Sequence, residues 1–446
     1  MLDLPAICRV RGTIAPAIRF EIWLPLGSAF NGRLQTVGGG GLAGNFDYEA
    51  MHTAVMTGFA SAATDTGHRA SDSWWLGDPQ RREDYGSRAV HETTLLTKTM
   101  IEIFYGDAPA YTYFNGCSTG GRQGLMEAQR YPDDYDGIIS GAPVNDFTNL
   151  HIGQLWTAHA TLIPDDSVLT ADDLQLVNDR VMAQCDANDG LEDGILADPR
   201  QCGFDPRELV CSRRSGEQCL SESKVDALEK IYGGAVNPRT GAQIYPGLEP
   251  GSENSQPNNP GWALIMNGET PFDIDISVIG GMGFENSNWD WRSFDFDRDV
   301  SQVNSKLAHV LNAVDPDLRD FNAQGGKLII WHGWNDPGVM PQRTIDYYED
   351  VLGFADQATG GSGLAATNDY LRLYMLPGVG HCRGGVGPDK VDWIDTITNW
   401  VENDQAPDVV IATRDDDPLA RPVCPYPQVA AYRRGDPNDP ASYRCE

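Results

Sequence analysis

YTYFNGCSTGGRQGLMEAQ (111–129) joins a strand-like apolar run to a helix-like run through a cluster of small residues around Cys117 and Ser118. Its central residues, GCSTG (116–120), match the G-x-S-x-G pattern of a nucleophile elbow, which requires a strand before the serine and a helix after it. The turn strains the central residue, so its neighbours must be small, and the helix N-terminus supplies N–H groups to a developing oxyanion. Ser118 holds the central position, and we therefore predict that Ser118, not Cys117, is the nucleophile.

The chain on either side of this motif alternates between strand-like and helix-like patterns. The sequence predicts strands over 19–26, 32–37, 110–115, 135–143, 326–334 and 370–378. It predicts helices over 85–106, 121–132, 343–353 and 392–403. This alternation is typical of an α/β protein with a parallel sheet covered by helices.

Residues 147–316 interrupt the alternation. The segment is rich in Asp, Asn, Gly and Pro, and its aromatic residues follow no regular spacing. We interpret it as an inserted lid domain. The predicted organisation is an α/β catalytic domain over 1–146 and 317–446, interrupted by a lid domain over 147–316.

The composition restricts the possible partners. The 446 residues carry a formal net charge of −31 at pH 7, and the pI is near 4.4. Such a negative field repels phosphate backbones and anionic membrane surfaces, so we expect neither nucleic-acid binding nor membrane binding. No apolar run approaches the ~18 residues of a membrane-spanning helix. The oligomeric state leaves no signature in the sequence.

The nine cysteines indicate the compartment. The pairs that lie close in sequence are Cys185–Cys202, Cys211–Cys219 and Cys424–Cys445. Disulfides at these pairs indicate an oxidising compartment, so we expect a secreted or periplasmic protein. Free thiols or zinc ligands are the alternative, although the chain has no C-x-x-C pair. Cys8 has no evident partner; we expect that partner, and an export signal, in a segment preceding this chain, because the first ten residues do not resemble a signal peptide.

The partners of a nucleophilic serine are expected later in the chain. An α/β-hydrolase places its catalytic residues in the order Ser, Asp or Glu, His, each in a loop after a strand. Asp336 directly follows the predicted strand 326–334, and His381 follows the strand 370–378. The alternatives are an Asp-Pro turn for Asp336 and an ordinary surface histidine for His381. The order favours an α/β-hydrolase fold with Ser118, Asp336 and His381 as its triad.

Two further cysteines flank the predicted catalytic residues. Cys117 precedes Ser118, and Cys382 follows His381. A histidine that takes the proton of a serine must approach it to roughly 3 Å, which brings the neighbouring residues within the about 4.4–6.8 Å Cα separation of a disulfide. We therefore predict a Cys117–Cys382 disulfide that clamps the two loops. A catalytic Cys117 thiolate is the alternative.

The glycine-rich loop VGGGGLAG (37–44) follows an early strand, where an α/β-hydrolase places its oxyanion loop. Glycine lets the backbone approach a bound ester closely. We predict an oxyanion hole formed by the N–H of Thr119 and the N–H of Gly40 or Gly41. A plain flexible turn is the alternative, and a phosphate-binding loop is disfavoured because no lysine follows with Walker spacing.

A cluster of carboxylates lies between two cysteines in CDANDGLEDGILADPRQC (185–202). Carboxylates packed so closely repel one another, and a hard cation with oxygen ligands removes that repulsion. The predicted ligands of one structural Ca²⁺ are the side chains of Asp186, Asp189 and Asp193 and the main-chain carbonyls of Leu191 and Ile195. The spacing is not that of an EF-hand, and a solvated acidic turn is the alternative.

Taken together, these residues resemble the tannase and feruloyl esterase family, which includes the mono(2-hydroxyethyl) terephthalate hydrolases. The resemblance covers nearly the whole chain and is densest in GCSTGGRQGLMEAQRYPDDYDGIISGAP (116–143), CDANDGLEDGILADP (185–199), HGWNDPGVMP (332–341) and GVGHCRGG (378–385). It implies the same triad, the same disulfide beside the triad and a Ca²⁺ in the lid. It also implies that His332, four residues before Asp336, lies near the substrate.

The resemblance implies a serine carboxylic ester hydrolase that acts on small aromatic esters, such as hydroxycinnamate (ferulate) or gallate esters. Hydrolysis of mono(2-hydroxyethyl) terephthalate or related synthetic esters is an alternative with the same triad. A catalytically silent, calcium-stabilised binding protein is an alternative of another class, and a peptidase or acyltransferase could also use this fold. Residues 245–300 match nothing in the family that we can place residue by residue, so the reaction is predicted more closely than the substrate.

Overall fold

A mixed eight-stranded sheet organises the chain, in the order β1-β2-β4-β3-β5-β6-β9-β10. The computed structural model describes residues 4–164, 166–212, 218–266, 268–361, 363–415 and 417–446. The strands of this sheet are β1 (Ile7–Ile14), β2 (Ile18–Pro25), β3 (Arg33–Val37), β4 (Ala60–Thr64), β5 (Tyr111–Cys117), β6 (Gly137–Gly141), β9 (Lys327–Gly333) and β10 (Leu371–Leu376). The β1–β2 and β2–β4 pairs are antiparallel and all other pairs are parallel, which confirms the predicted α/β class.

Helices cover both faces of the sheet. They are α1 (Tyr48–Met56), α3 (Ala89–Tyr105), α4 (Thr119–Arg130), α11 (Pro341–Thr359) and α13 (Trp393–Asn403). Successive residues of a strand point to opposite faces, so in β5 the buried Phe114 packs in the cluster under α3, α4 and α11, whereas Tyr113 packs in the cluster under α1 and α13. Short helices α2 (Pro79–Glu83) and α12 (Gly363–Thr367) lie in the connections.

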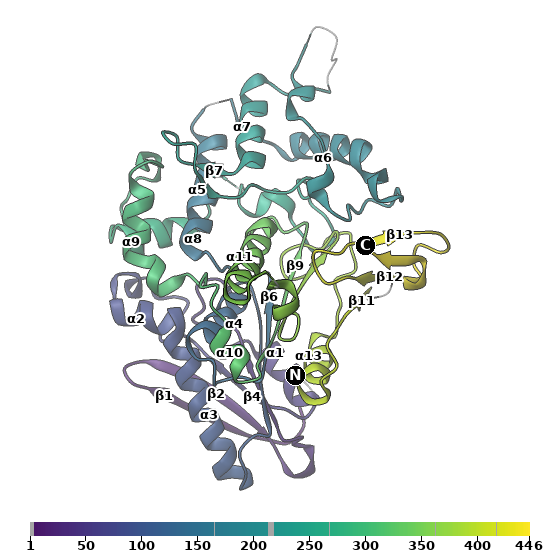
Figure 1. Cartoon of the computed structure of the whole chain (residues 1–446). Coiled ribbons are helices and arrows are strands. Elements are labelled where there is room, and N and C mark those ends of the chain that lie inside the picture. The colour runs from purple at the N-terminus through teal and green to yellow at the C-terminus, as the bar shows by residue number, and fades with distance from the viewer. Residues whose placement is uncertain (1–3, 165, 213–217, 267, 362, 416) are drawn as a thin grey trace.

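Between β6 and β9 the chain forms a second lobe, drawn in teal and green above the sheet in Figure 1. Its elements are α5 (Phe147–Leu162), α6 (Ala171–Cys185), α7 (Glu222–Gly233), β7 (Ala235–Val236), β8 (Gln243–Tyr245), α8 (Asp273–Asp275) and α9 (Asp299–Leu311). Its hydrophobic residues, such as Leu155, Leu228 and Trp262, pack in one cluster that continues into the sheet domain through Tyr85 and Met340. The short helix α10 (Arg319–Ala323) follows the lobe and packs through Phe321 in the cluster under α3, α4 and α11. α5 begins at 147 and residue 316 falls between α9 and α10, and the division into two domains at these positions stays a prediction.

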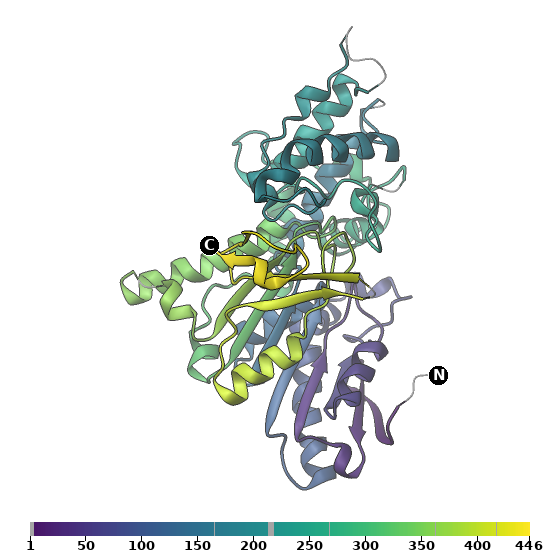
Figure 2. The same cartoon turned by 90° about the vertical axis from the view of Figure 1, so that its right-hand side faces the viewer.

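The C-terminal segment adds two hairpins, which Figure 2 shows in yellow between the second lobe and the sheet. Their strands are β11 (Val410–Arg414), β12 (Asp417–Val423), β13 (Ala430–Tyr432) and β14 (Tyr443–Cys445). The structure contains the four predicted disulfides, Cys117–Cys382, Cys185–Cys202, Cys211–Cys219 and Cys424–Cys445. Four disulfides indicate that the protein matures in an oxidising compartment.

Two other expectations concern single features of the chain. Cys8 is a free, partly buried thiol in this structure. Among the described helices, none has the length and apolar character needed to cross a bilayer.

Candidate active site

Ser118 lies at the junction between β5 and α4 in a strained backbone conformation, with φ 64° and ψ −123°. Its N–H donates to the carbonyl of Gly141 (2.9 Å), and its own carbonyl accepts from the N–H groups of Arg122 (3.0 Å) and Val144 (3.2 Å). A non-glycine residue with positive φ persists only where its surroundings fix it. The backbone at Ser118 is fixed on both sides, and its side chain remains partly exposed.

The glycines around Ser118 allow two backbone segments to touch. A Cβ at Gly116 would lie 2.7 Å from the carbonyl carbon of Gly120, and one at Gly38 would lie 2.6 Å from the Cα of Gly120. Real Cβ atoms do not approach backbone so closely. The first turn of α4 therefore packs directly on β5 and on the glycine-rich loop, which is the sharp turn that the G-x-S-x-G pattern predicts.

Asp336 and His381 form a hydrogen-bonded pair. The Nδ1 of His381 lies 2.6 Å from Asp336 Oδ2. Burial alone would raise the pKa of Asp336, but the charges and hydrogen bonds of His381 and His332 hold that pKa well below its usual range. Burial alone would lower the pKa of His381, but the charge and hydrogen bond of Asp336 outweigh it and raise the pKa of the imidazole. Because Nδ1 donates to the carboxylate, Nε2 of the neutral ring is left to accept a proton.

Asp336 is completely buried and every one of its oxygens has partners. Oδ1 accepts from the N–H groups of Gly338 (2.8 Å) and Val339 (2.9 Å), which follow it in the same loop. Oδ2 accepts from His332 Nε2 at 3.0 Å as well as from His381. The carboxylate is thereby fixed in one orientation toward His381, as an orienting acid requires.

His332 lies behind Asp336, where it is 0% exposed. Its Nε2 also lies 3.0 Å from the carbonyl of Val339, and its Nδ1 lies 2.8 Å from the hydroxyl of Thr344. Two acceptors at Nε2 assign the proton to that nitrogen. Both ring nitrogens are thus occupied by protein groups, and the contacts of His332 are with the acid rather than with a space open to substrate.

The disulfide between Cys117 and Cys382 links the loops of Ser118 and His381. Its Cα atoms are 6.0 Å apart, although 265 positions separate the two cysteines in the sequence. Cys117 is therefore bonded in this structure and is not available as a thiolate nucleophile. The bond brings the residues next to Ser118 and His381 within a few ångströms of each other.

The glycine-rich loop is held by side chains from two other segments. The hydroxyls of Thr119 (2.6 Å) and Tyr85 (2.9 Å) both donate to the carbonyl of Gly41. Gly41 has φ 54°, which glycine adopts without strain. A Cβ at Gly41 would lie 3.7 Å from Ile274 of the inserted lobe, so the loop lies beneath that lobe. A Cβ added at Gly40 would meet no atom within 4 Å.

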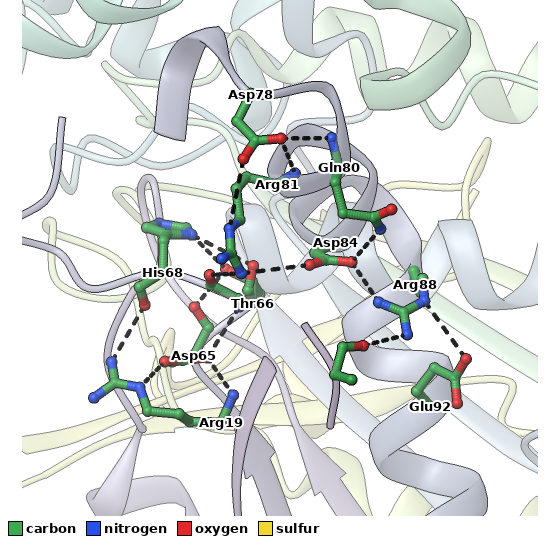
Figure 3. A network of polar contacts seen from close by, with 12 residues as sticks. Arg19, Asp65, Thr66, His68, Asp78, Gln80, Arg81, Asp84, Arg88 and Glu92 are labelled. Carbon is green, nitrogen blue, oxygen red and sulfur yellow. Dashed lines mark hydrogen bonds and ion pairs between the residues drawn. The ribbon is translucent and has the colours of Figure 1, made fainter. Parts of the chain in front are cut away.

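A buried histidine supports the same loop from behind. His68 Nε2 donates to the carbonyl of Leu42 at 2.7 Å, and its ring stacks on Trp75 with centroids 3.9 Å apart. Burial lowers the pKa of His68, which keeps the ring neutral. Figure 3 shows the polar network around Asp65, Thr66 and His68, in which Arg19 pairs with Asp65.

The inserted lobe contacts the loops of the acid and the histidine. Gln154 of α5 donates to the carbonyl of Gly338 (2.6 Å), and Asn259 donates to the carbonyl of Asn335 (3.0 Å). Leu264 is so close that a Cβ at Gly338 would lie 2.9 Å from it. No spacing pattern in the sequence marks Gln154, Asn259 or Leu264 as contacts of the site. Gln154 alone leaves a signal, because a glutamine in a buried helix must find a hydrogen-bond partner for its amide.

The acidic loop of the inserted lobe folds around its own backbone. Carboxylate oxygens of Asp186, Asp189 and Asp193 accept from N–H groups of the same loop at 3.0–3.2 Å. Asp193 also pairs with Arg421 of β12 at 2.7 Å. Burial and the nearby carboxylates raise the pKa of Asp189 to about 6, and they also raise the pKa of Asp186.

This loop fits a hard dication. Burial and the nearby charge of Asp193 raise the pKa of Asp186 and of Asp189, while Arg421 pairs with Asp193. The predicted donors are all oxygen atoms, including the carbonyls of Leu191 and Ile195, which Ca²⁺ prefers. The Cys185–Cys202 disulfide closes the segment that contains them.

Comparison with known proteins identifies the family of the chain. The family described as "Tannase and feruloyl esterase" matches residues 5–446 of the chain. An uncharacterized esterase of Xanthomonas campestris pv. campestris is 35% identical over 99% of this chain and 84% of that protein. The mono(2-hydroxyethyl) terephthalate hydrolase of Piscinibacter sakaiensis is 30% identical over 99% of this chain and 85% of that protein.

A solved structure shows the fold. The crystal structure of feruloyl esterase B from Aspergillus oryzae superposes with a TM-score of 0.88 at 27% identity, covering 99% of this chain and 90% of that chain. Together with the strand order β1-β2-β4-β3-β5-β6-β9-β10, this similarity confirms the predicted α/β-hydrolase fold.

Proposed function

Because the chain belongs to the tannase and feruloyl esterase family and is a carboxylic ester hydrolase, we propose that it cleaves esters of aromatic acids with Ser118, His381 and Asp336 as its triad. One observation carries this proposal. The buried Asp336 holds the imidazole of His381 through Nδ1, and a disulfide ties the neighbour of His381 to the neighbour of a strained serine. Hydroxycinnamate (ferulate) and gallate esters are the first substrates to consider.

In the proposed reaction Ser118 Oγ attacks the ester carbonyl carbon while its proton moves to Nε2 of His381. Asp336 stabilises the imidazolium that forms, without taking a proton itself. The oxyanion of the tetrahedral intermediate accepts hydrogen bonds from the N–H of Thr119, at the start of α4, and from the N–H of Gly40 or Gly41. The hydrogen bond from the Thr119 hydroxyl to the Gly41 carbonyl keeps these two sides of the oxyanion hole in register.

The second half of the reaction releases the acid. The intermediate collapses by breaking the bond to the alcohol oxygen, which leaves with the proton held by His381. A water molecule then gives its proton to His381 Nε2 and attacks the acyl group on Ser118. Collapse of this second intermediate breaks the bond to Oγ, returns the proton to Ser118 and frees the aromatic acid.

A second candidate substrate is mono(2-hydroxyethyl) terephthalate. The supporting observation is the 30% identity to the hydrolase of Piscinibacter sakaiensis named for that ester. The triad would be the same for both classes of ester, so residues of the inserted lobe would determine which substrate the enzyme prefers. We therefore select Ile274, beside the glycine-rich loop, and Leu264, beside the acid loop, as the first lobe residues to test for contact with an acyl group.

The acidic loop has a structural role in this proposal. Asp186, Asp189 and Asp193, with the carbonyls of Leu191 and Ile195, bind one Ca²⁺, which neutralises their mutual repulsion and keeps the loop packed against β12. The four disulfides support secretion or a periplasmic location.

Initial rates on methyl ferulate, methyl gallate and mono(2-hydroxyethyl) terephthalate test the proposal, with Ser118→Ala measured beside the wild type. We expect turnover of at least one ester and a loss of about 10⁴-fold or more in Ser118→Ala. Wild-type rates in Ser118→Ala would refute the triad. Absence of turnover on all three esters would refute the substrate class and leave the triad to be tested separately.

A further inference from the structure

A second cluster of ionisable side chains lies toward the end of α4 that is remote from Ser118. It consists of His91 from α3, Glu127 from α4 and Asp134 from the turn between α4 and β6. One potential ligand atom from each residue lies within 4.8 Å of the other two. His91 Nδ1 and Asp134 Oδ2 are 2.6 Å apart. The proposed reaction uses none of these residues.

Glu127 is the unusual member of this cluster. It is 0% exposed, and as a carboxylate it finds no hydrogen-bond donor in the described part of the chain, because its contact within the cluster is Asp134, another acid. A buried carboxylate without a partner is strongly unfavourable. Burial, the charge of Asp134 and a hydrogen bond with Asp134 raise the pKa of Glu127 well above the usual range. Lys98, a nearby cation, instead reaches the carbonyl of Asp133 (3.4 Å).

We propose that His91, Glu127 and Asp134 bind a first-row transition-metal dication, for which Zn²⁺ is the probe. One imidazole nitrogen with two carboxylate oxygens is a ligand set that zinc accepts, and small side-chain rotations bring atoms within 4.8 Å onto one tetrahedral centre. The ion supplies the missing partner of Glu127 and replaces the direct contact between His91 and Asp134.

The surroundings of His91 suit this role. Its ring stacks on Tyr131 with centroids 3.9 Å apart and an interplanar angle of 10°, which fixes the direction of Nδ1. The side chain of His91 is 25% exposed, so the ion has a path of entry and a fourth position open to water. The bound ion would cross-link α3 to α4, the helix whose first turn carries the nucleophile elbow.

The site differs from the proposed Ca²⁺ loop in chemistry and position. It includes a nitrogen ligand and lies between two helices of the sheet domain, whereas the acidic loop of 186–195 offers oxygen atoms in the inserted lobe. A proton shared between Glu127 and Asp134 is the competing occupant of this cluster. If a shared proton occupies the cluster, the chain binds no Zn²⁺ there, so titration with Zn²⁺ distinguishes a proton from a metal ion as the occupant.

Calorimetric titration of the full chain with Zn²⁺, after chelation and dialysis into excess Ca²⁺, tests the site. Glu127→Gln removes a ligand while keeping the side chain's shape, and His91→Phe removes the ligand nitrogen while keeping a ring to stack on Tyr131. Asp133→Asn, an exposed neighbour outside the cluster, is the matched control.

We expect one Zn²⁺ to bind to the wild type and to Asp133→Asn, and at least about tenfold weaker binding in both ligand variants, since even indirect changes alter metal affinity by that factor. Zn²⁺ should also raise Tm in the first two proteins and not in the ligand variants. No stoichiometric binding to the wild type, or equal binding by all four proteins, would overturn the proposal in favour of the shared proton.

Discussion

The disulfide between Cys117 and Cys382 joins the last residue of β5 to the loop that follows β10, although β6 and β9 lie between these two strands in the sheet. Ser118 follows the first cysteine and His381 precedes the second. The distance between nucleophile and base in the proposed triad is thus set by a covalent bond as well as by packing. Cys382 has a positive φ of 62°, and so does Ser118, the residue after Cys117, with a φ of 64°.

We predict that the double variant Cys117→Ala, Cys382→Ala loses both stability and activity. A disulfide that closes a loop of 265 positions stabilises the protein by about 5.5 kcal/mol in the chain-entropy model. Release of the two loops should also lower kcat on the order of hundredfold, since an ångström of misplacement has that effect. Thermal unfolding and initial rates measure the two losses.

The matched control is Cys424→Ala, Cys445→Ala, whose disulfide closes a loop of 21 positions away from the site. It should lose about 3 kcal/mol of stability and keep its kcat at temperatures where it is folded. If both double variants lost activity equally, the clamp would have no special role in catalysis.

The Asp336–His381 pair predicts the pH dependence of the reaction. His381 must be neutral to accept the proton of Ser118, and Asp336 raises its pKa. Activity should therefore rise with pH through an apparent pKa above the about 6.5 of a free histidine. Asp336→Asn should lower that apparent pKa and reduce kcat by about 10⁴-fold. An unchanged apparent pKa in a pH profile of kcat/KM would contradict the pairing.

Gly116 should not tolerate a side chain. Gly116→Ala would place a Cβ 2.7 Å from the backbone of Gly120, and we expect it to lose about 3 kcal/mol or more of unfolding free energy, at the upper end of overpacking. Gly353→Ala is the control, because a Cβ there meets nothing within 4 Å and it lies in the interior of α11. It should gain about 0.5–1 kcal/mol. Equal unfolding free energies of the two variants would contradict the close packing at the elbow.

The elements that carry the proposed triad could be predicted from sequence because each has a local signal. β5, β9 and β10 are short apolar runs that end in turn residues, and G-x-S-x-G follows the first of them. β4 was not predicted, because Ala60–Thr64 (ASAAT) is fully buried yet has only one β-branched residue and no alternation. Its assignment depends on pairing with β2 and β3, which is tertiary information.

The supports of the site are harder to predict. Tyr85 and His68 hold the glycine-rich loop by donating hydrogen bonds to its backbone carbonyls. Every residue has such a carbonyl, so the sequence does not show which ones accept these bonds. The resemblance implies that His332 lies near the substrate, which stays a prediction, and it does not indicate the contact with Asp336 that the structure shows. Contacts of Gln154 and Asn259 with the acid loop depend on how the inserted lobe docks, which periodicity does not encode.

Removal of Ca²⁺ should destabilise the inserted lobe. Chelation should lower Tm, and Ca²⁺ at a hundred times its Kd should restore about 2.7 kcal/mol. Asp189→Asn should abolish the response because it replaces a partly buried carboxylate of the loop, whereas Glu192→Gln, an exposed acid in the same loop, should keep it. A Tm that does not depend on Ca²⁺ in the wild type would rule out the calcium site.

Covalent labelling with a serine-directed fluorophosphonate, followed by peptide mass spectrometry, tests the nucleophile most directly. We predict a single adduct on Ser118, absent from Ser118→Ala and formed far more slowly in His381→Ala, because His381 activates the serine. An adduct on another residue, or equal labelling of the wild type and Ser118→Ala, would contradict Ser118 as the nucleophile.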